Sequence, residues 1–171
     1  MSYAISIPTL DDTYELAVML NQSWIETYPN EAAGVSLEYI KGRSDRRLGS
    51  NALEKRRSAI QQSYDDPDYF MRIAKDETGS IVGSIYGYKK DDTYELDGLY
   101  TLQRTHGTGL GLQLWTVFKD WVGDVTIDLS VVTYNARAKA FYTKLGFIDV
   151  AGSERLLGDS IIPVVDMVRQ L

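Results

Sequence analysis

Residues 99–111 read LYTLQRTHGTGLG, and this stretch decides how the rest of the chain is interpreted. The residues before it alternate in hydrophobicity as a strand does, whereas Leu110, Leu114, Phe118 and Trp121 recur at helical spacing. A glycine-rich junction between a strand and a helix directs backbone N–H groups and the positive end of the helix dipole at one point. The stretch therefore predicts a site for a phosphate or pyrophosphate group.

Two common phosphate-binding patterns do not match this stretch. A P-loop needs Lys and then Ser or Thr at the helix start, whereas residues 109–112 are Gly-Leu-Gly-Leu. The dinucleotide fingerprint needs a third glycine three residues after the second, and Leu112 occupies that position when counted from Gly109. NTP hydrolysis and a Rossmann half are both disfavoured.

The flanking periodicity predicts the order β-α-α-β-β-β-α-β-α-β-β. A strand over residues 3–7 precedes a helix that begins at a capping box in residues 9–12 and ends near Trp24. A second helical region is expected after the loop at residues 29–34; its apolar stripe runs over residues 48–60, and residues 65–68 stop it. The next expected elements are three antiparallel strands, a helix, a strand, a helix and two strands, over residues 69–75, 80–88, 93–102, 110–121, 125–131, 135–145, 147–157 and 161–168.

Length and composition indicate one domain over residues 1–171. Hydrophobic residues make up 44% of the 171 residues, which is enough for a single core. The chain has no cysteine, and this excludes disulfides, thiolate metal sites and a cysteine nucleophile. Its one histidine, His106, cannot build a multi-histidine zinc site. We therefore expect no metal.

The charge distribution argues against nucleic-acid binding. The formal net charge is −6, opposite in sign to the basic footprint of most nucleic-acid-binding domains. Residues 41–57 depart from this average, because their seven cations and two acids sum to +5 and leave −11 for the rest of the chain. A solvated helix face is the commoner explanation of such a run, and a site for an anionic partner is the alternative.

The sequence contains no signal for a membrane or for export. No window approaches the ~18 consecutive apolar residues of a transmembrane helix. The first residues lack the basic and apolar regions of a signal peptide. We expect a cytoplasmic protein without a membrane partner.

Two motifs resemble the GNAT superfamily of N-acetyltransferases. Residues 99–101 with residues 106–111 are similar to the family's acetyl-CoA loop, and residues 135–147, NARAKAFYTKLGF, are similar to its second CoA and catalytic segment. The resemblance covers the whole chain. It implies the GNAT fold, of the α/β (α+β) class, with a mixed and largely antiparallel sheet of about seven strands flanked by four helices.

Within the superfamily, the chain looks most like the PaiA-type spermidine/spermine acetyltransferases. The similar features are the strand residues 94–100 and a C-terminal arrangement that includes Gly152, residues 158–159 and residues 166–167. The resemblance implies acetyl-CoA as co-substrate, no metal and a small-molecule amine acceptor such as a polyamine. A homodimer is compatible with it.

The resemblance also implies roles for individual residues. Tyr142 occupies the family's general-acid position and lies seven residues after Asn135, on the same helix face. We expect the base to be Glu95 or Asp97, which share a strand face; Asp97 could instead attract the cationic acceptor. The residues expected to bind the cofactor are Leu99, Tyr100, Thr101, His106, Gly107, Thr108, Gly109, Leu110, Gly111, Asn135 and Lys144. Each role has a competing structural interpretation. Tyr142 could be a core tyrosine, Glu95 and Asp97 could form a solvated strand face, and Asn135 could be only an N-cap.

The charged residue of the glycine-rich loop has two candidates. The family has Gln or Arg in the first position of the loop, where the register of the preceding strand places His106; Arg104 satisfies the same pattern two residues earlier. We favour His106, because a small shift in a loop costs less than moving the helix start. On the acceptor side we expect the cluster Trp24, Glu26, Tyr28 and Glu31.

Two other functions also fit the sequence. The departure from the family pattern at His106 is compatible with a CoA-binding sensor or scaffold without turnover. The cationic residues 41–57 are compatible with a peptide or protein N-acetyltransferase that docks an acidic partner. The absence of cysteine favours direct attack of the amine on the thioester over a covalent acyl-enzyme.

Overall fold

A mixed sheet of eight strands forms the centre of the computed structural model, which describes residues 2–170. The strand order is β1-β2-β3-β4-β5-β8-β6, and β7 also pairs with β8. Every pairing is antiparallel except that of β4 with β5. The strands are β1 (Ala4–Ser6), β2 (Tyr69–Lys75), β3 (Ile81–Lys90), β4 (Thr93–Thr101), β5 (Ile127–Val132), β6 (Ile148–Asp149), β7 (Arg155–Leu156) and β8 (Pro163–Arg169).

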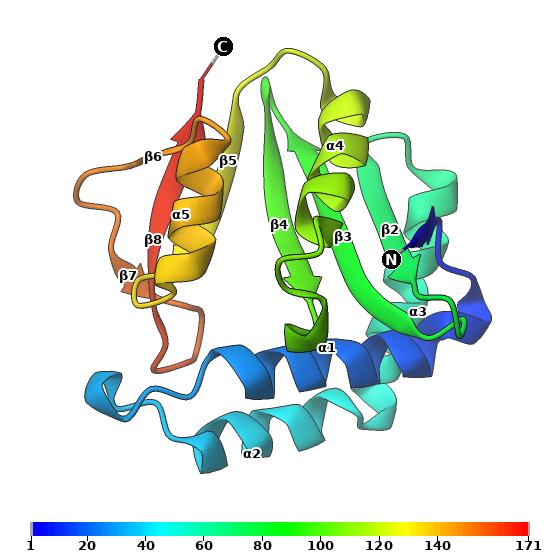
Figure 1. Cartoon of the computed structure of the whole chain (residues 1–171), viewed down its shortest axis with the longest axis horizontal. Helices are drawn as coiled ribbons and strands as arrows, with labels where there is room; N and C mark the ends of the chain where they lie inside the picture. Colours follow the sequence, from blue (N-terminus) through cyan, green and yellow to red (C-terminus); the bar gives the residue numbers. More distant parts are fainter. Residues whose placement is uncertain (1, 171) are drawn as a thin grey trace.

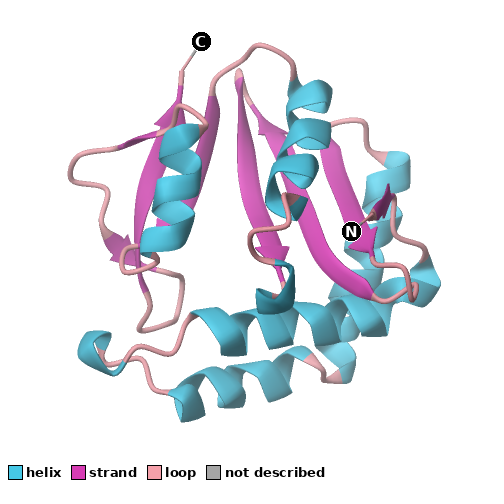
Figure 2. Ribbon diagram, in the orientation of Figure 1, coloured by secondary structure: helices cyan, strands magenta, loops and turns pink. Residues whose placement is uncertain are grey.

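Five α-helices cover the two faces of this sheet. They are α1 (Thr13–Thr27), α2 (Leu37–Arg47), α3 (Ser50–Asp65), α4 (Leu110–Val122) and α5 (Ala136–Lys144). In Figure 1, α4 and α5 lie in front of the sheet, while α1 and α2 run side by side across its lower end. Figure 2 shows the same layers by type of element. None of the helices within residues 2–170 has both the length and the hydrophobicity that a membrane span requires.

The buried side chains form three clusters. The largest lies beneath α4 and α5 and includes Phe118, Leu114 and Phe147. The other two lie on the opposite face, one between α1, α3 and the strands β2 and β3, and one that joins α1 and α2 to β5 and β8. Helix α1 therefore contributes to both clusters of the opposite face, and the largest cluster joins strands from both halves of the sheet.

The local signals at the helix ends are confirmed. The Asp12 carboxylate accepts hydrogen bonds from the backbone N–H of Thr9 at 2.7 Å and from its hydroxyl at 2.9 Å, as a capping box requires. Asn135 caps α5 by accepting a hydrogen bond from the Ala138 N–H at 3.1 Å. Gly146, at φ +91°, ends the same helix.

Two predicted elements are each divided in the structure. The second helical region consists of two helices. The first, α2, ends at Arg47, and α3 begins after Gly49, whose backbone is extended. The buried face of α2 contains only Ile40 and Ser44, so its apolar periodicity is too weak to be seen in the sequence. The strand expected over residues 147–157 is interrupted by a turn and pairs with β8 as β6 and β7. The fold therefore has five helices and eight strands rather than four and about seven.

Candidate active site

Strands β4 and β5 are joined only at their first residues. Tyr94 pairs with Ile127 and Glu95 pairs with Asp128, and no further pairs join the two strands within residues 2–170. The strands diverge beyond this point, as Figure 1 shows. A cavity of about 870 Å³ occupies the resulting space and is also lined by α1, by α5 and by the start of α4.

The glycine-rich loop forms one end of this cavity. Gly107 at φ +79° and Gly109 at φ +86° adopt left-handed conformations that favour glycine, and Gly109 directly precedes α4. The first N–H groups of a helix have no carbonyl partner in a preceding turn. Gly111, in that first turn, lines the cavity and carries no side chain to cover these groups. The loop is therefore built to receive an anion, as its sequence predicts.

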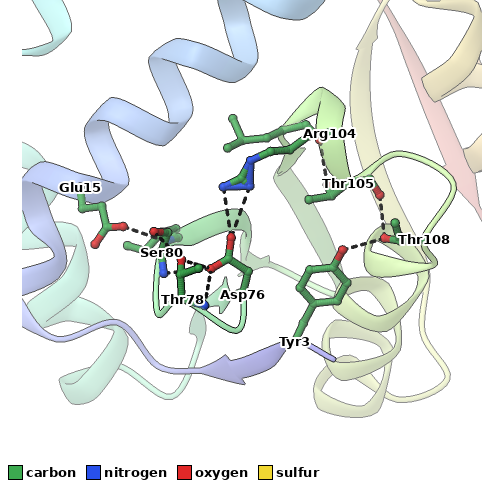
Figure 3. A network of polar contacts seen from close by, with 10 residues as sticks. Tyr3, Glu15, Asp76, Thr78, Ser80, Arg104, Thr105 and Thr108 are labelled. Carbon is green, nitrogen blue, oxygen red and sulfur yellow. Dashed lines mark hydrogen bonds and ion pairs between the residues drawn. The ribbon is translucent and has the colours of Figure 1, made fainter. Parts of the chain in front are cut away.

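A chain of hydrogen bonds holds this loop in place (Figure 3). The Thr108 hydroxyl donates to the Thr105 carbonyl at 2.7 Å, so the Tyr3 hydroxyl must donate the 3.0 Å bond that joins Tyr3 to Thr108. Thr108 is the one predicted cofactor residue absent from the cavity lining. Its side chain anchors the loop instead.

His106 and Arg104 have different surroundings. The Arg104 guanidinium forms an ion pair with the Asp76 carboxylate, with N–O distances of 3.2 and 3.4 Å (Figure 3). His106 lines the cavity, and its Nε2 atom is buried without a hydrogen-bond partner in the described part of the chain. The pKa of His106 is lowered, first by burial and then by the nearby charge of Arg137, so the imidazole is neutral at pH 7. This geometry favours His106 over Arg104 as the polar side chain of the loop.

Tyr142 lies inside the cavity on α5. Its side chain is only 8% exposed and contacts Phe141 and Phe147 edge to face. Burial, and then the nearby Tyr100 phenol, raise the pKa of Tyr142 well above its ordinary value, although Arg137 opposes this shift. The hydroxyl therefore keeps its proton at neutral pH.

The two carboxylates of β4 line the same cavity. A β-bulge leaves Asp97 as an extra residue of β4, since Tyr86 pairs with Gly98 while Gly87 pairs with Leu96. Burial, more than the neighbouring acids, raises the pKa of Glu95, and Lys90, at 3.9 Å, opposes the shift. Desolvation also raises the pKa of Asp97, even though its side chain is exposed through the cavity.

The other predicted cofactor residues border the cavity from three sides. Leu99, Tyr100 and Thr101 follow the bulge on β4, and Asn135 and Lys144 lie at opposite ends of α5. Leu99 packs toward α4 whereas Tyr100 packs toward α1, so the backbone between them faces the gap between β4 and β5. Asn135 is both an N-cap and a lining residue.

The cluster expected on the acceptor side is only partly brought together. Trp24 and Tyr28 line the cavity, with their rings edge to face at 4.7 Å. The Glu26 carboxylate instead accepts hydrogen bonds from the Gln103 N–H at 2.7 Å and from Gln22 at 2.9 Å. Glu31 lies outside the lining.

Several polar lining residues were not expected from the sequence, and the charged ones among them are Arg137 and Arg155. Arg137 lies one residue into α5 and affects the pKa of both Tyr142 and His106. Ser130 lies on β5 and Arg155 on β7, the two strands on either side of β8, and Arg155 pairs with Asp166 of β8 at 2.7 Å. Arg137 belongs to the motif at residues 135–147 and could have been noticed there, whereas the other two depend on the pairing of β5 and β7 with β8.

The sequence and the fold are similar to those of known proteins. The family described as "Acetyltransferase (GNAT) family" matches residues 23–147. No curated protein matches the sequence. A PaiA N-acetyltransferase from Thermoplasma acidophilum in complex with coenzyme A has a similar structure, with 23% identity, full coverage of both chains and a TM-score of 0.79.

Two further solved structures share the fold. One is yncA from Salmonella typhimurium with its cofactor acetyl-CoA, at 16% identity, 100% and 95% coverage of the two chains and a TM-score of 0.70. The other is the ribosomal-protein-alanine N-acetyltransferase of Brucella melitensis, at 18% identity, 98% and 99% coverage and a TM-score of 0.71. At these identities the similarity concerns the fold alone.

Proposed function

Because the chain belongs to the acetyltransferase (GNAT) family, we propose that it transfers an acetyl group from acetyl-CoA directly to a primary amine held between β4 and β5. Family membership makes it an acetyl-CoA-dependent N-acetyltransferase. Direct attack, the primary amine, its small-molecule nature and the cytoplasmic location expected from the sequence are parts of the proposal.

One observation carries this proposal. A single cavity is lined by the start of α4, by the protonated Tyr142 hydroxyl and by the carboxylates of Glu95 and Asp97. An anionic cofactor, an acid for the leaving group and a base for the amine would thus meet in one place. Within residues 2–170, no three His, Asp or Glu side chains are grouped to hold a metal ion.

Each residue then has a stated task in the transfer. Acetyl-CoA supplies an activated acetyl group as a thioester. The N–H groups at the start of α4 bind its phosphates, and the β4 backbone from Leu99 to Thr101 positions its extended arm. The Tyr142 hydroxyl donates a proton to the departing sulfur, while Glu95 accepts the amine proton, directly or through water. His106, a neutral imidazole whose Nε2 has no partner within residues 2–170, adds a polar group to the lining of the cavity.

A polyamine is the finer acceptor hypothesis within this proposal. Glu95 and Asp97 supply the negative charge that would attract a cationic amine, and the resemblance to PaiA-type enzymes supports it. The shared fold by itself does not specify the acceptor, since a ribosomal-protein-alanine N-acetyltransferase has it too.

The proposal is tested by measuring CoA thiol release from acetyl-CoA in the presence of a broad panel of amines. We expect release that depends on the amine and yields the N-acetylated product. Tight binding of acetyl-CoA without turnover on any amine would instead support the sensor or scaffold hypothesis.

Replacement of Glu95 by Gln is expected to lower kcat/KM at least tenfold at neutral pH. Burial raises the pKa of Glu95 above its ordinary 4.5, so wild-type activity should rise with pH above that value as the base loses its proton. The variant should lose this rise. Asp97→Asn is the matched comparison. A larger loss of kcat/KM in Asp97→Asn than in Glu95→Gln would identify Asp97 as the base.

The same variant also gives a stability signature. A folded pKa above the unfolded one means that the folded state binds the Glu95 proton more tightly, so unfolding free energy falls as pH rises from 4.5 through the folded pKa. Glu95→Gln avoids this loss and should be at least as stable as the wild type at pH 7 in denaturant titrations. Loss of stability together with activity would indicate a structural role instead.

The two candidates for the glycine-rich loop can be separated by KM. His106→Ala should raise the KM for acetyl-CoA severalfold, because His106 lines the cavity. Arg104→Gln should leave that KM within about twofold, because its guanidinium is paired with Asp76. The reverse order would show that Arg104 leaves Asp76 to reach the cofactor.

A further inference from the structure

Three arginines of the cationic segment are turned toward the protein interior. Arg43 and Arg47 are one helical turn apart on α2, on the face that includes the buried Ile40 and Ser44, and Arg56 precedes the buried Ile60 by one turn on α3. All three are partly buried. The exposed cations of the segment are Lys41, Arg46, Lys55 and Arg57. The run is therefore not one solvated face, and we call Arg43, Arg47 and Arg56 the arginine cluster.

The arginine cluster has no acidic partner in the described part of the chain. None of its members belongs to an ion pair there. The Nε atoms of Arg43 and Arg56 are buried without a hydrogen-bond partner. Arg43 reaches only the Tyr39 hydroxyl, at 3.3 Å. A buried charged donor without an acceptor lowers the stability of a fold, and an acceptor atom of a ligand would satisfy these groups.

Arg47 connects the cluster to the active-site cavity. Its guanidinium carbon lies 3.5 Å from the centre of the Trp24 ring, and Trp24 lines the cavity. Burial lowers the pKa of Arg47 from the ordinary arginine value, but arginine stays charged at neutral pH. One aromatic side chain therefore touches the cation and borders the space proposed for acetyl transfer.

A second hollow, of about 430 Å³, adjoins this point. It is lined by Arg43, Arg46, Arg47, Ala52 and Asp159. Asp159 is the acidic group of the lining, and it forms no ion pair with the arginines. The hollow is large enough for a carboxylate or a phosphate group, and its lining carries more positive than negative charge.

The carboxylate of Asp97 lies near the same cluster. The charges of Asp97 and Arg56 act in opposite directions on the pKa of Tyr86, and those of Asp97 and Arg47 do so on the pKa of Tyr100. In both tyrosines burial is the larger cause of the raised pKa. Asp97 and the arginine cluster therefore act on the same two buried tyrosines.

We propose that the arginine cluster binds an anionic group of the acceptor, so that the preferred substrate is an amine that also carries a carboxylate or a phosphate. This inference rests on the proposed function and specifies a substrate class that is an alternative to the polyamine. The ammonium end would approach Asp97 and Glu95. The anionic end would accept hydrogen bonds from Arg43 and Arg47, which line the second hollow, and Arg56 would add positive charge beside Arg47. A polycation would instead bring further positive charge against three unpaired guanidinium groups.

Pairs of amines that differ in one anionic group test this proposal. Suitable pairs are cadaverine with lysine, ethanolamine with O-phosphoethanolamine, and tyramine with tyrosine, and spermidine represents the polycations. We expect kcat/KM to be at least tenfold higher for the anionic member of one or more pairs. The first and second pairs separate carboxylate from phosphate recognition. A preference for spermidine, or for the member of each pair that lacks the anionic group, would overturn the proposal and leave the proposed function standing.

Variants within the cluster locate the effect. Arg56→Gln and Arg43→Gln should reduce the preference for the anionic member at least tenfold, mainly through KM. Arg57→Gln and Lys41→Gln remove the same charge from exposed positions on the same helices and should retain the preference. Equal losses in all four variants would assign the effect to the general surface charge and overturn the proposal.

A binding measurement keeps the test independent of turnover. If no amine is acetylated, the proposed function fails, and the protein is titrated with inorganic phosphate and with acetate while the arginine Nε–H signals are followed by NMR. Saturable shifts at Arg43 and Arg56, without a shift at Arg57, would support the anion site. No shift with either anion would overturn it.

Discussion

Replacing Tyr142 by Phe is expected to lower kcat at least tenfold at neutral pH and to leave the KM for acetyl-CoA within about twofold. The substitution removes one hydroxyl from a ring that is only 8% exposed and keeps the ring contacts with Phe141 and Phe147. The fold should therefore be retained while the proton donor is lost.

The pH dependence of this loss checks the acid role. Burial raises the pKa of Tyr142 well above its ordinary value, so its hydroxyl stays protonated over the usual assay range. The ratio of wild-type to variant kcat should therefore stay nearly constant up to about pH 9. Tyr14→Phe, on the exposed surface of α1, is the matched control and should change neither constant. An unchanged kcat in Tyr142→Phe would remove Tyr142 from the role of acid.

Replacing Gly87 by Ala is expected to destabilise the protein by about 3 kcal/mol, since overpacking typically costs ~1–3 kcal/mol and here involves backbone. A Cβ atom at this position would overlap the Glu95 carbonyl oxygen and approach the Phe118 ring to 2.8 Å. Phe118 is fully buried, so it has no free space into which to move. The β-bulge at Asp97 lies opposite Tyr86 and Gly87 of β3, so the substitution should also distort the bulge.

Thermal unfolding measures this prediction. A loss of that size corresponds to a decrease in Tm of roughly 10 °C for a domain of this length. Gly42→Ala is the matched control, because Gly42 lies in α2 with no atom within 4 Å of an added Cβ. This control should raise stability by up to about 1 kcal/mol through helix propensity. If Gly87→Ala unfolds at the wild-type temperature, β3 and β4 make room for the added methyl group without loss of stability, and the prediction is wrong.

Local patterns in the sequence predicted most of the fold. The glycine-rich junction, the capping box at Thr9 and the cap at Asn135 each depend on a few neighbouring residues, and each is present in the structure. The break at Gly49 was missed because α2 buries few apolar side chains. The turn between β6 and β7 was missed because both short strands pair with the distant β8.

In the candidate site, too, the features that local sequence determines were predicted and those that depend on distant residues were not. Tyr142, Glu95 and Asp97 do line one cavity, as do all the predicted cofactor residues except Thr108. Their roles in binding and catalysis stay predictions. The inward orientation of Arg56 could not be seen, because a charged residue gives no apolar signal even when its helix position faces the core. The choice between His106 and Arg104 depended on Asp76, which lies 28 residues from Arg104 in the chain.

The short pairing between β4 and β5 gives the sheet two inner edges. Beyond Glu95 and Asp128, each strand turns one row of backbone groups toward the other without pairing with it. Exposed edges of this kind normally invite strands of other chains and promote aggregation. Here the two edges face each other across the space between α4 and α5, and both line the cavity, which a slender ligand with amide groups can enter. The same gap thus offers main-chain hydrogen bonds to a ligand that fits between the strands.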